Sequence, residues 1–410
     1  MPRLGYPAAG NAPREREGEW AMTLQPSRLR TEYRENPIGI DVERPRLSWT
    51  VESSERGQFQ RAYQVLVATS PEGLEPGSAD LWDSGRVDSD TTAHIPYSGP
   101  LLPSRVRAWW AVRVWDRDNA PSDWSKPAFW EVGLLALTDW RADWISHPRL
   151  VPDEEIPEAR ELDGLVPAPL FRRAFTVRDG VARARLYATA RGVYEPRLNG
   201  RQVGDQALAP GWTDYHRRIQ VQTFDVTGLL QPGENILGAI VAPGWYAGYV
   251  GWGRYCRHYG QTPQVLMQLH IDYADGTSEV VATDEAWCCA TGATRYADLL
   301  HGEYIDARQA CIGWDGPDFG ADGWLPVRCT RLTATPLVAE VAEPVRALEE
   351  ITPVAITSPS PGVHLFDLGQ NITGRARLRA TGPAGTTVRL RYGEMLNPDG
   401  TLYTANLRSA

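Results

Sequence analysis

The highest density of aromatic side chains lies in the glycine-rich segment Gly244–Gly260, which holds Trp245, Tyr246, Tyr249, Trp252, Tyr255 and Tyr259. Flat aromatic rings can stack on the C–H face of a sugar. Three further residues of the segment, Arg254, Arg257 and His258, can donate hydrogen bonds to hydroxyl groups. Glycine lets such a loop bend sharply and lets a ligand approach its backbone. The segment is therefore a candidate carbohydrate-binding loop, and the alternative is that its rings pack against a neighbouring domain.

A second group of aromatic and acidic residues lies in PGWTDYHRR, where Trp212, Asp214 and Tyr215 are candidate sugar contacts. Asp205, shortly upstream, is expected near the same rim. Carboxylate and carbonyl oxygens on loops are the ligands that Ca²⁺ prefers. The sequence has no EF-hand spacing and assigns no individual ligand, so it leaves a calcium site open.

Two carboxylates in HGEYIDAR, Glu303 and Asp306, have the residue types of a glycosidase pair. The carboxyl groups of an inverting pair lie roughly 6.5–9.5 Å apart, whereas residues three apart on an extended segment point to opposite faces. Glu303 is therefore predicted to lie at the rim of a sugar site, with structural hydrogen bonding as the alternative. The sequence has no GxSxG, HExxH, P-loop or strand-following GxGxxG motif. No catalytic residue is assigned.

The composition argues against nucleic acids and membranes as partners. The 410 residues include 42 Lys and Arg against 51 Asp and Glu, a formal net charge of -9, and the basic run at 216–218 is too short for a phosphate-binding patch. The sequence has no apolar run of about 18 residues that would span a bilayer. It has 16 Trp and 16 Tyr against 7 Phe. That balance suits sugar contact, although β-rich cores also favour aromatic residues.

The cysteines and the N-terminal residues favour a cytoplasmic location. The five cysteines, Cys256, Cys288, Cys289, Cys311 and Cys329, contain no CxxC pair and so predict neither a zinc knuckle nor a thioredoxin motif. The first residues have no apolar segment of the secretory type, so reduced thiols are expected. Residues 1–23 are predicted to be a disordered tail, and Met22 is a candidate start.

Short alternating runs punctuated by glycine and proline predict an all-β protein of tandem β-sandwiches. Residues 24–134 are predicted to form a fibronectin type III-like or immunoglobulin-like sandwich. Its clearest strand is Arg107–Trp115, with Trp109 on one face and Trp110 on the other. The acidic, proline-rich residues 135–169 are predicted to be a linker.

Residues 170–332 are predicted to form a jelly roll, because at least eight alternating runs fit in this length and Asn199-Gly200 is a hairpin signal. Residues 335–410 are predicted to begin another β-sandwich, which the sequence leaves incomplete. Its expected strands are Val363–Leu368, Arg375–Ala380 and Thr387–Tyr392. Three strands cannot close a sandwich.

Several long motifs resemble one family in the same order along the sequence. NPIGIDVERPRLSW, RAYQVLVATS and WWAVRVWDRDNAPSDWS resemble the opening module of bacterial α-L-rhamnosidases, family 78 of the glycoside hydrolases. ARGVYEPRLNGRQVGDQALAPGWTDYHRR, APGWYAGYVGW and GEYIDAR resemble the family's jelly-roll domain. FDLGQNITGRARLRATGPAGTTVRLRYGEMLNPDGTLYTANLRSA resembles the start of the β-sandwich that follows. The resemblance extends from about residue 24 to residue 410.

In that family the chemistry resides in an (α/α)6 barrel after these β domains, where an acidic general acid and an acidic general base act by inversion. The resemblance implies the non-catalytic N-terminal part of an enzyme that releases terminal α-L-rhamnose from glycosides. Its implied partners are rhamnose-containing glycans and the missing barrel, whose site Glu303 would help to close. The 410-residue chain by itself is expected not to hydrolyse α-L-rhamnosides. Some members of the family have a jelly-roll domain that binds rhamnose together with calcium. The resemblance therefore leaves open whether this chain uses Ca²⁺ as a cofactor.

Two alternatives belong to other classes. One is a free-standing carbohydrate-binding protein whose jelly roll acts as a lectin. The other is a purely structural module of several sandwiches.

Overall fold

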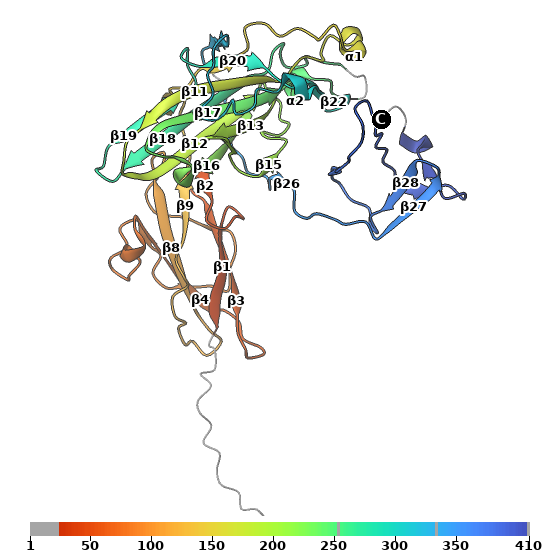
Figure 1. The fold of residues 1–410 in the computed structure, drawn as a ribbon. Helices are drawn as coiled ribbons and strands as arrows, with labels where there is room; N and C mark the ends of the chain where they lie inside the picture. The colour runs from red at the N-terminus through yellow and green to blue at the C-terminus, as the bar shows by residue number, and fades with distance from the viewer. Residues whose placement is uncertain (1–23, 252–254, 333–334, 408–410) are drawn as a thin grey trace, which may run out of the picture. The chain divides into compact units, whose positions relative to one another are not determined.

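The computed structural model describes residues 24–251, 255–332 and 335–407, so the predicted tail lies outside the described residues. Two compact units divide the chain, one ending at Leu135 and the other beginning at Ala136. Sheets dominate both units (Figure 1), and the α-helices of the described residues are the short α1 (Pro157–Glu161) and α2 (Gly244–Ala247). The all-β prediction is confirmed. None of the described helices is long and apolar enough to cross a membrane.

The first unit contains two sheets. Three strands form one sheet in the order β1-β3-β7: β1 (Gln25–Thr31), β3 (Arg46–Glu52) and β7 (Ile95–Pro96). The other sheet has the order β2-β9-β8-β4-β5, with β6 also paired to β4: β2 (Ile38–Ile40), β4 (Ala62–Ala68), β5 (Trp82–Asp83), β6 (Val87–Asp88), β8 (Arg107–Trp115) and β9 (Ala128–Val132). The alternation along β8 places Trp110, Val112 and Val114 in the core with 0% exposure. Trp109 is only partly buried and packs against Phe129, with ring centroids 5.1 Å apart.

Arginines cover several tryptophans of the first unit. The guanidinium of Arg113 lies 4.9 Å from the ring centroids of both Trp115 and Trp124. Arg107 lies 4.3 Å from the Phe129 ring and pairs with the buried carboxylate of Glu131 at 2.9 Å. Cation–π contacts of this kind stabilise a partly exposed sheet face. Part of the tryptophan content is therefore structural.

The second unit is built around two larger sheets. The seven-stranded sheet has the order β24-β10-β18-β12-β16-β25, with β19 also paired to β18: β10 (Trp144–Ser146), β12 (Val181–Arg191), β16 (Ile219–Asp225), β18 (Gln264–Tyr273), β19 (Ser278–Ala282), β24 (Arg328–Thr330) and β25 (Leu337–Ala339). The six-stranded sheet has the order β14-β13-β17-β11-β20-β23: β11 (Pro169–Val177), β13 (Val193–Leu198), β14 (Arg201–Gln202), β17 (Gly233–Ala242), β20 (Cys288–Thr291) and β23 (Leu325–Pro326).

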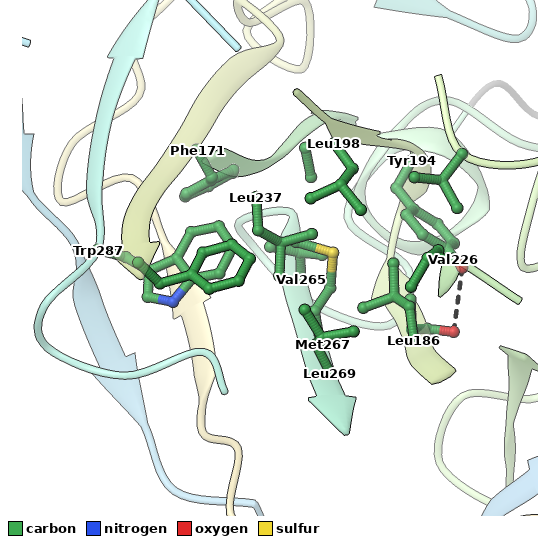
Figure 2. Packing of buried hydrophobic residues seen from close by; sticks show 14 of the residues in the cluster. Phe171, Leu186, Tyr194, Leu198, Val226, Leu237, Val265, Met267, Leu269 and Trp287 are labelled. Carbon is green, nitrogen blue, oxygen red and sulfur yellow. Dashed lines mark hydrogen bonds between the residues drawn. The ribbon is translucent and has the colours of Figure 1, made fainter. Parts of the chain in front are cut away.

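The core of the second unit lies between these two sheets. Figure 2 shows Phe171 and Leu237 from the six-stranded sheet beside Met267 and Leu269 from the seven-stranded sheet. Trp287, at 1% exposure, fills the end of this core, and its indole nitrogen donates to the carbonyl of Ala282 at 2.8 Å. Each of these strands directs alternate side chains into the core, and β12, β17 and β18 are buried on their other face as well.

The segment predicted to be a linker is instead part of the second unit. Strand β10 within it pairs with β18 and β24. The charged part that follows is anchored by Ile156, Ala159 and Leu165, which are at most 4% exposed. The few apolar residues of this segment follow neither the spacing of a strand nor that of a helix. Their burial was therefore not predicted from hydrophobic periodicity.

Residues beyond 332 also complete the second unit. Strand β25 adds to β16 in parallel, with Ile219 opposite Leu337. A two-stranded sheet joins β15 (Gln206–Ala207) to β26 (Val345–Arg346). The unit's strands therefore extend past the predicted end of the jelly roll at residue 332.

Residues 351–407 form hairpins with little buried surface. The pairs are β27 (Ala355–Ser360) with β28 (Val363–Asp367), and β29 (Met395–Leu396) with β30 (Leu402–Tyr403). The expected strands at 375–380 and 387–392 are not formed, because a strand needs a partner and none of the described residues pairs with them. Many apolar side chains here are more than 40% exposed: Ile356, Val363, Phe366, Ile372, Leu378, Val388, Leu390, Tyr392, Met395 and Leu396.

Replacing Leu237 with Ala should lower the free energy of unfolding of the second unit by roughly 3 kcal/mol, because it leaves a cavity between the sheets. Leu300→Ala is the matched control, since Leu300 is 48% exposed and should cost less than about 0.5 kcal/mol. Denaturant unfolding of both variants measures the difference. Equal losses in the free energy of unfolding of the two variants would contradict the placement of Leu237 in the core.

A chain that ends at Glu350 should aggregate less than the 410-residue chain, because it removes the exposed apolar residues of 351–407 and keeps β25 and β26. Light scattering at increasing protein concentration measures this. A monodisperse 410-residue chain at the highest concentration would count against the expectation.

Candidate functional site

An aromatic cluster on the second unit brings together two of the predicted segments. The indole nitrogen of Trp212 donates to the hydroxyl of Tyr259 at 3.2 Å. The ring of Tyr215 lies between those of Tyr246 and Tyr259, at centroid distances of 5.4 and 5.1 Å. Trp245 and Tyr246, on α2, pack with Tyr215 against one hydrophobic cluster. The turn 212–216 and three residues of the separately predicted loop, Trp245, Tyr246 and Tyr259, thus form one aromatic cluster.

This cluster rests on the face of the seven-stranded sheet that points away from the main core. Trp144 of β10, Ile219 of β16 and Leu266 of β18 are its buried floor, at no more than 1% exposure. Their neighbours in sequence point to the intersheet core, because side chains alternate across a strand. The aromatic rings therefore cover the outside of a sheet.

Two glycines let the loop close over this floor. Gly244 has φ +49°, and a Cβ there would lie 2.7 Å from the backbone nitrogen of Val193. A Cβ at Gly260 would collide with the hydroxyl of Tyr246. Both positions need glycine for close approach of the backbone.

A partly buried guanidinium contacts two rings of the cluster. Arg191 is 4.5 Å from the ring centroid of Trp144 and 5.9 Å from that of Tyr246, and it donates to Gln264 Oε1 at 2.8 Å. Burial lowers the pKa of Arg191, opposed by the nearby Tyr246. Burial also raises the pKa of Tyr215 well above its ordinary value, so this phenol stays neutral and serves packing and hydrogen bonding.

The members of the cluster differ in exposure. Tyr215 is 3% exposed and donates its hydroxyl proton to the carbonyl of Gly211 at 3.2 Å. Trp212 is 53% exposed. Asp214 accepts from the backbone nitrogen of His216 at 3.1 Å and lies 3.5 Å from its imidazole. Tyr215 is thus a packing residue and Asp214 shapes the turn, which leaves Trp212 to present a ring face to solvent.

Tyr249 lies in a different cluster. It is 7% exposed and packs with Leu165 and Tyr296, and its backbone nitrogen donates to Asp298 Oδ2 at 2.8 Å. Burial is the main cause of its raised pKa. Its position suits packing rather than contact with a ligand. Trp252 and Arg254, the other predicted contacts of this loop, lie outside the described residues.

Glu303 lies on an exposed hairpin formed by β21 (Thr294–Asp298) and β22 (Gly302–Ile305), opposite Ala297. Asp306 has a structural role, because its carboxylate accepts from the backbone nitrogen and guanidinium of Arg308. The hydrogen bonds from Arg308 lower the pKa of Asp306. The two carboxylates have different environments and do not form an acid–base pair.

The described residues contain no group of three or more His, Cys, Asp or Glu side chains that could hold a metal ion. Asp205, expected near the same rim, pairs instead with Arg346 at 2.9 Å. The five cysteines are free thiols, and burial raises the pKa of Cys289 to about 12. A protonated, buried thiol is inert.

The sequence did not single out His216, Arg191 or the floor residue Trp144 as parts of the site. His216 lies 5.3 Å from the Tyr259 ring, centroid to centroid. Arg191 ends a strand whose alternation could have placed it on the outer face together with Thr189. Trp144 was assigned to the linker, where no pairing partner could be inferred.

The fold is that of a multi-domain β protein with an aromatic cluster on the outer face of one sheet. Three family matches cover successive parts of the chain. They are the Rha78A-like N-terminal immunoglobulin domain over residues 26–136, the alpha-L-rhamnosidase N-terminal domain over 179–349, and the bacterial alpha-L-rhamnosidase concanavalin-like domain over 357–410. The chain belongs to the bacterial α-L-rhamnosidase family and carries its N-terminal domains.

Individual relatives agree with this assignment. The chain is 37% identical to an alpha-L-rhamnosidase of Streptomyces avermitilis over 92% of its length, which is 52% of that protein. The crystal structure of the Streptomyces avermitilis enzyme complexed with L-rhamnose matches with a TM-score of 0.85 at 36% identity, over 95% of this chain and 53% of that one. The alpha-L-rhamnosidase structure from Dictyoglumus thermophilum matches with a TM-score of 0.80 at 32% identity, over 92% of this chain and 42% of that one.

The chain thus spans about half the length of the relatives it matches. The alignment with the Streptomyces avermitilis protein runs over 538 positions, more than the 410 residues of this chain. That relative therefore carries inserted residues with no counterpart here.

Tyr215→Ala should lower the free energy of unfolding of the second unit by roughly 3–5 kcal/mol, because it removes a buried ring from between two others. Trp212→Ala should cost less than about 1 kcal/mol, since most of that ring face is already in water. Thermal unfolding of the two variants compares them. If Trp212→Ala were as costly as Tyr215→Ala, the exposed ring would be a packing element.

Proposed function

We propose that these domains are the non-catalytic N-terminal part of an α-L-rhamnosidase that releases terminal α-L-rhamnose from glycosides. Family membership over nearly the whole chain carries this proposal. The described residues hold only helices of five and four residues, so they contain no helical barrel. The chemistry is assigned to residues of the longer polypeptide, and the β domains support that catalytic part.

A role in closing the catalytic site suits the β21–β22 hairpin. Every residue of β22 is exposed, including Glu303 and the apolar Tyr304 and Ile305, which are 44% and 55% exposed. Tyr296, on the other strand, is 7% exposed and anchors the hairpin to the unit. We assign to Glu303 the rim position expected from the sequence, with its carboxylate free to meet the catalytic part.

We propose that the aromatic cluster contacts the glycan, with Trp212 as the stacking face. The half-exposed indole is the supporting observation. Its polar edge already donates to Tyr259, so the accessible part is an apolar face of the type that stacks on sugar C–H groups. Trp245, Tyr246 and Tyr215 position the loop beneath it. A free-standing lectin is not favoured, because the family similarity covers all three domains in succession.

The 410-residue chain should not hydrolyse 4-nitrophenyl α-L-rhamnopyranoside. A longer polypeptide that continues the reading frame into an all-helical domain should hydrolyse it, because the acid–base pair is assigned there. Release of nitrophenol by both proteins measures this. Turnover by the 410-residue chain that survives purification and is abolished by Glu303→Gln or Asp306→Asn would overturn the assignment.

A further inference from the structure

The turn that presents Trp212 is basic on its exposed side, although the chain as a whole carries a net charge of -9. The side chains of His216 and Arg217 are 68% and 86% exposed. Arg218 follows them at an exposed position. Within the described part of the chain, no carboxylate pairs with the guanidinium of Arg218. Thr213 Oγ1 donates to the carbonyl of Arg218 at 2.7 Å, so one closed turn carries the indole and all three basic residues.

Local carboxylates do not neutralise this turn. Asp214 is the acidic residue of the turn, and it lies 3.5 Å from His216 and 3.7 Å from Arg217. One carboxylate therefore faces two partners and leaves Arg218 uncompensated. The ring of His258 also lies 4.7 Å from the phenol ring of Tyr259, centroid to centroid. Arg257 does not contribute, because its guanidinium binds Asp163 at 2.7 Å.

The geometry of the cluster places these basic side chains beside an aromatic surface. Tyr259 connects them, because its hydroxyl accepts from Trp212 while its ring contacts both His216 and His258. Arg217 and Arg218 follow Trp212 in the same closed turn, so the indole and the basic donors lie on one short segment. Donors of this type form their strongest hydrogen bonds with anionic oxygens.

We propose that this surface, Trp212 with His216, Arg217 and Arg218, binds a saccharide residue that carries an anionic group, a carboxylate or a sulfate. The inference rests on the glycan contact proposed above and names its ligand class. The indole supplies contact to the C–H face, and the basic residues select the charged substituent. Rhamnose itself is neutral, so the surface recognises a charged neighbour of rhamnose in an acidic glycan.

The test uses the 410-residue chain and sugars that share one ring but differ at carbon 6: D-glucuronate, D-glucose 6-sulfate and D-glucose, with L-rhamnose as a fourth ligand. Shifts of the Trp212 indole N–H signal, assigned by its loss in Trp212→Phe, report binding at the site. We expect either or both anionic sugars to bind about two- to five-fold more tightly than glucose, the strength of an exposed ion pair. The two anionic sugars together show whether carboxylate, sulfate or both are accepted. The preference should disappear in roughly 0.5 M salt, because salt screens exposed charges.

Variants separate the contribution of the Trp212 indole from that of the basic residues. Trp212→Ala lacks the reporter signal, so saturation transfer to the sugar protons measures its binding, which should be about ten-fold weaker or more for every sugar. The double variant Arg217→Ala, Arg218→Ala should remove the preference for anionic sugars and leave glucose unchanged. Phe59→Ala is the matched control, since Phe59 in the first unit is 50% exposed with an arginine over its ring and should change nothing. Unfolding midpoints confirm that each variant is folded.

Four results would overturn the inference. Equal binding of glucose and both anionic sugars, or a preference that survives the double arginine variant, would remove the selection of charge. Binding of L-rhamnose above both anionic sugars would keep the glycan contact and reject the acidic ligand. No shift with any sugar at about 50 mM would reject the sugar site itself, and the assignment to the α-L-rhamnosidase family would stand.

Discussion

The two-sided burial of strand β18 is the constraint on which the second unit depends. Val265, Met267 and Leu269 point to the intersheet core at 0% exposure. On the opposite face Leu266 and Gln268 are also at 0%, so that face needs a cover as complete as the core. The cover includes residues 139–141, because Gln268 donates to the carbonyl of Asp139 and accepts from the backbone nitrogen of Arg141. A buried amide must find such partners.

The need to cover this face also explains why some of the aromatic residues are buried and others are exposed. Rings that reach the sheet become floor or filling, as Trp144 and Tyr215 do. A ring at the outer margin is held by its edge and keeps one face free, as Trp212 does. Covering the outer face of one sheet therefore leaves some aromatic rings fully buried and one, Trp212, half exposed. Residue type alone does not distinguish these roles.

Strand alternation made most of the architecture predictable. The pattern in 107–115 located β8 and separated its two faces, and Asn199-Gly200 marked the turn between β13 and β14. The failures have a common physical cause. Strand β10 has three residues and its partners lie far away in sequence, so no local period could reveal it. Segments 375–380 and 387–392 have strand-like patterns, but pairing depends on neighbours that a pattern does not contain.

The candidate site shows the same limit. The sequence named Trp212, Tyr215, Trp245 and Tyr246 because their types are unusual, and the structure brings them together. Tyr249 has the same type and the same loop, yet it packs elsewhere with Tyr296. The partners that decide this lie on other strands. Whether the described contacts include sugar stays a prediction.

The pairing order of the seven-stranded sheet has a consequence for synthesis on the ribosome. The Ser146 hydroxyl of β10 donates a hydrogen bond to the carbonyl of Arg328 of β24, 182 residues later. Strand β16 likewise pairs with β25, which is synthesised after it. At typical elongation rates of about 5–20 residues per second, β10 emerges roughly 9–36 seconds before β24. Both margins of the sheet therefore stay unpaired during much of translation. Until residues up to 339 have been synthesised, strands β10 and β16 keep unpaired edges of the kind that promotes association between chains.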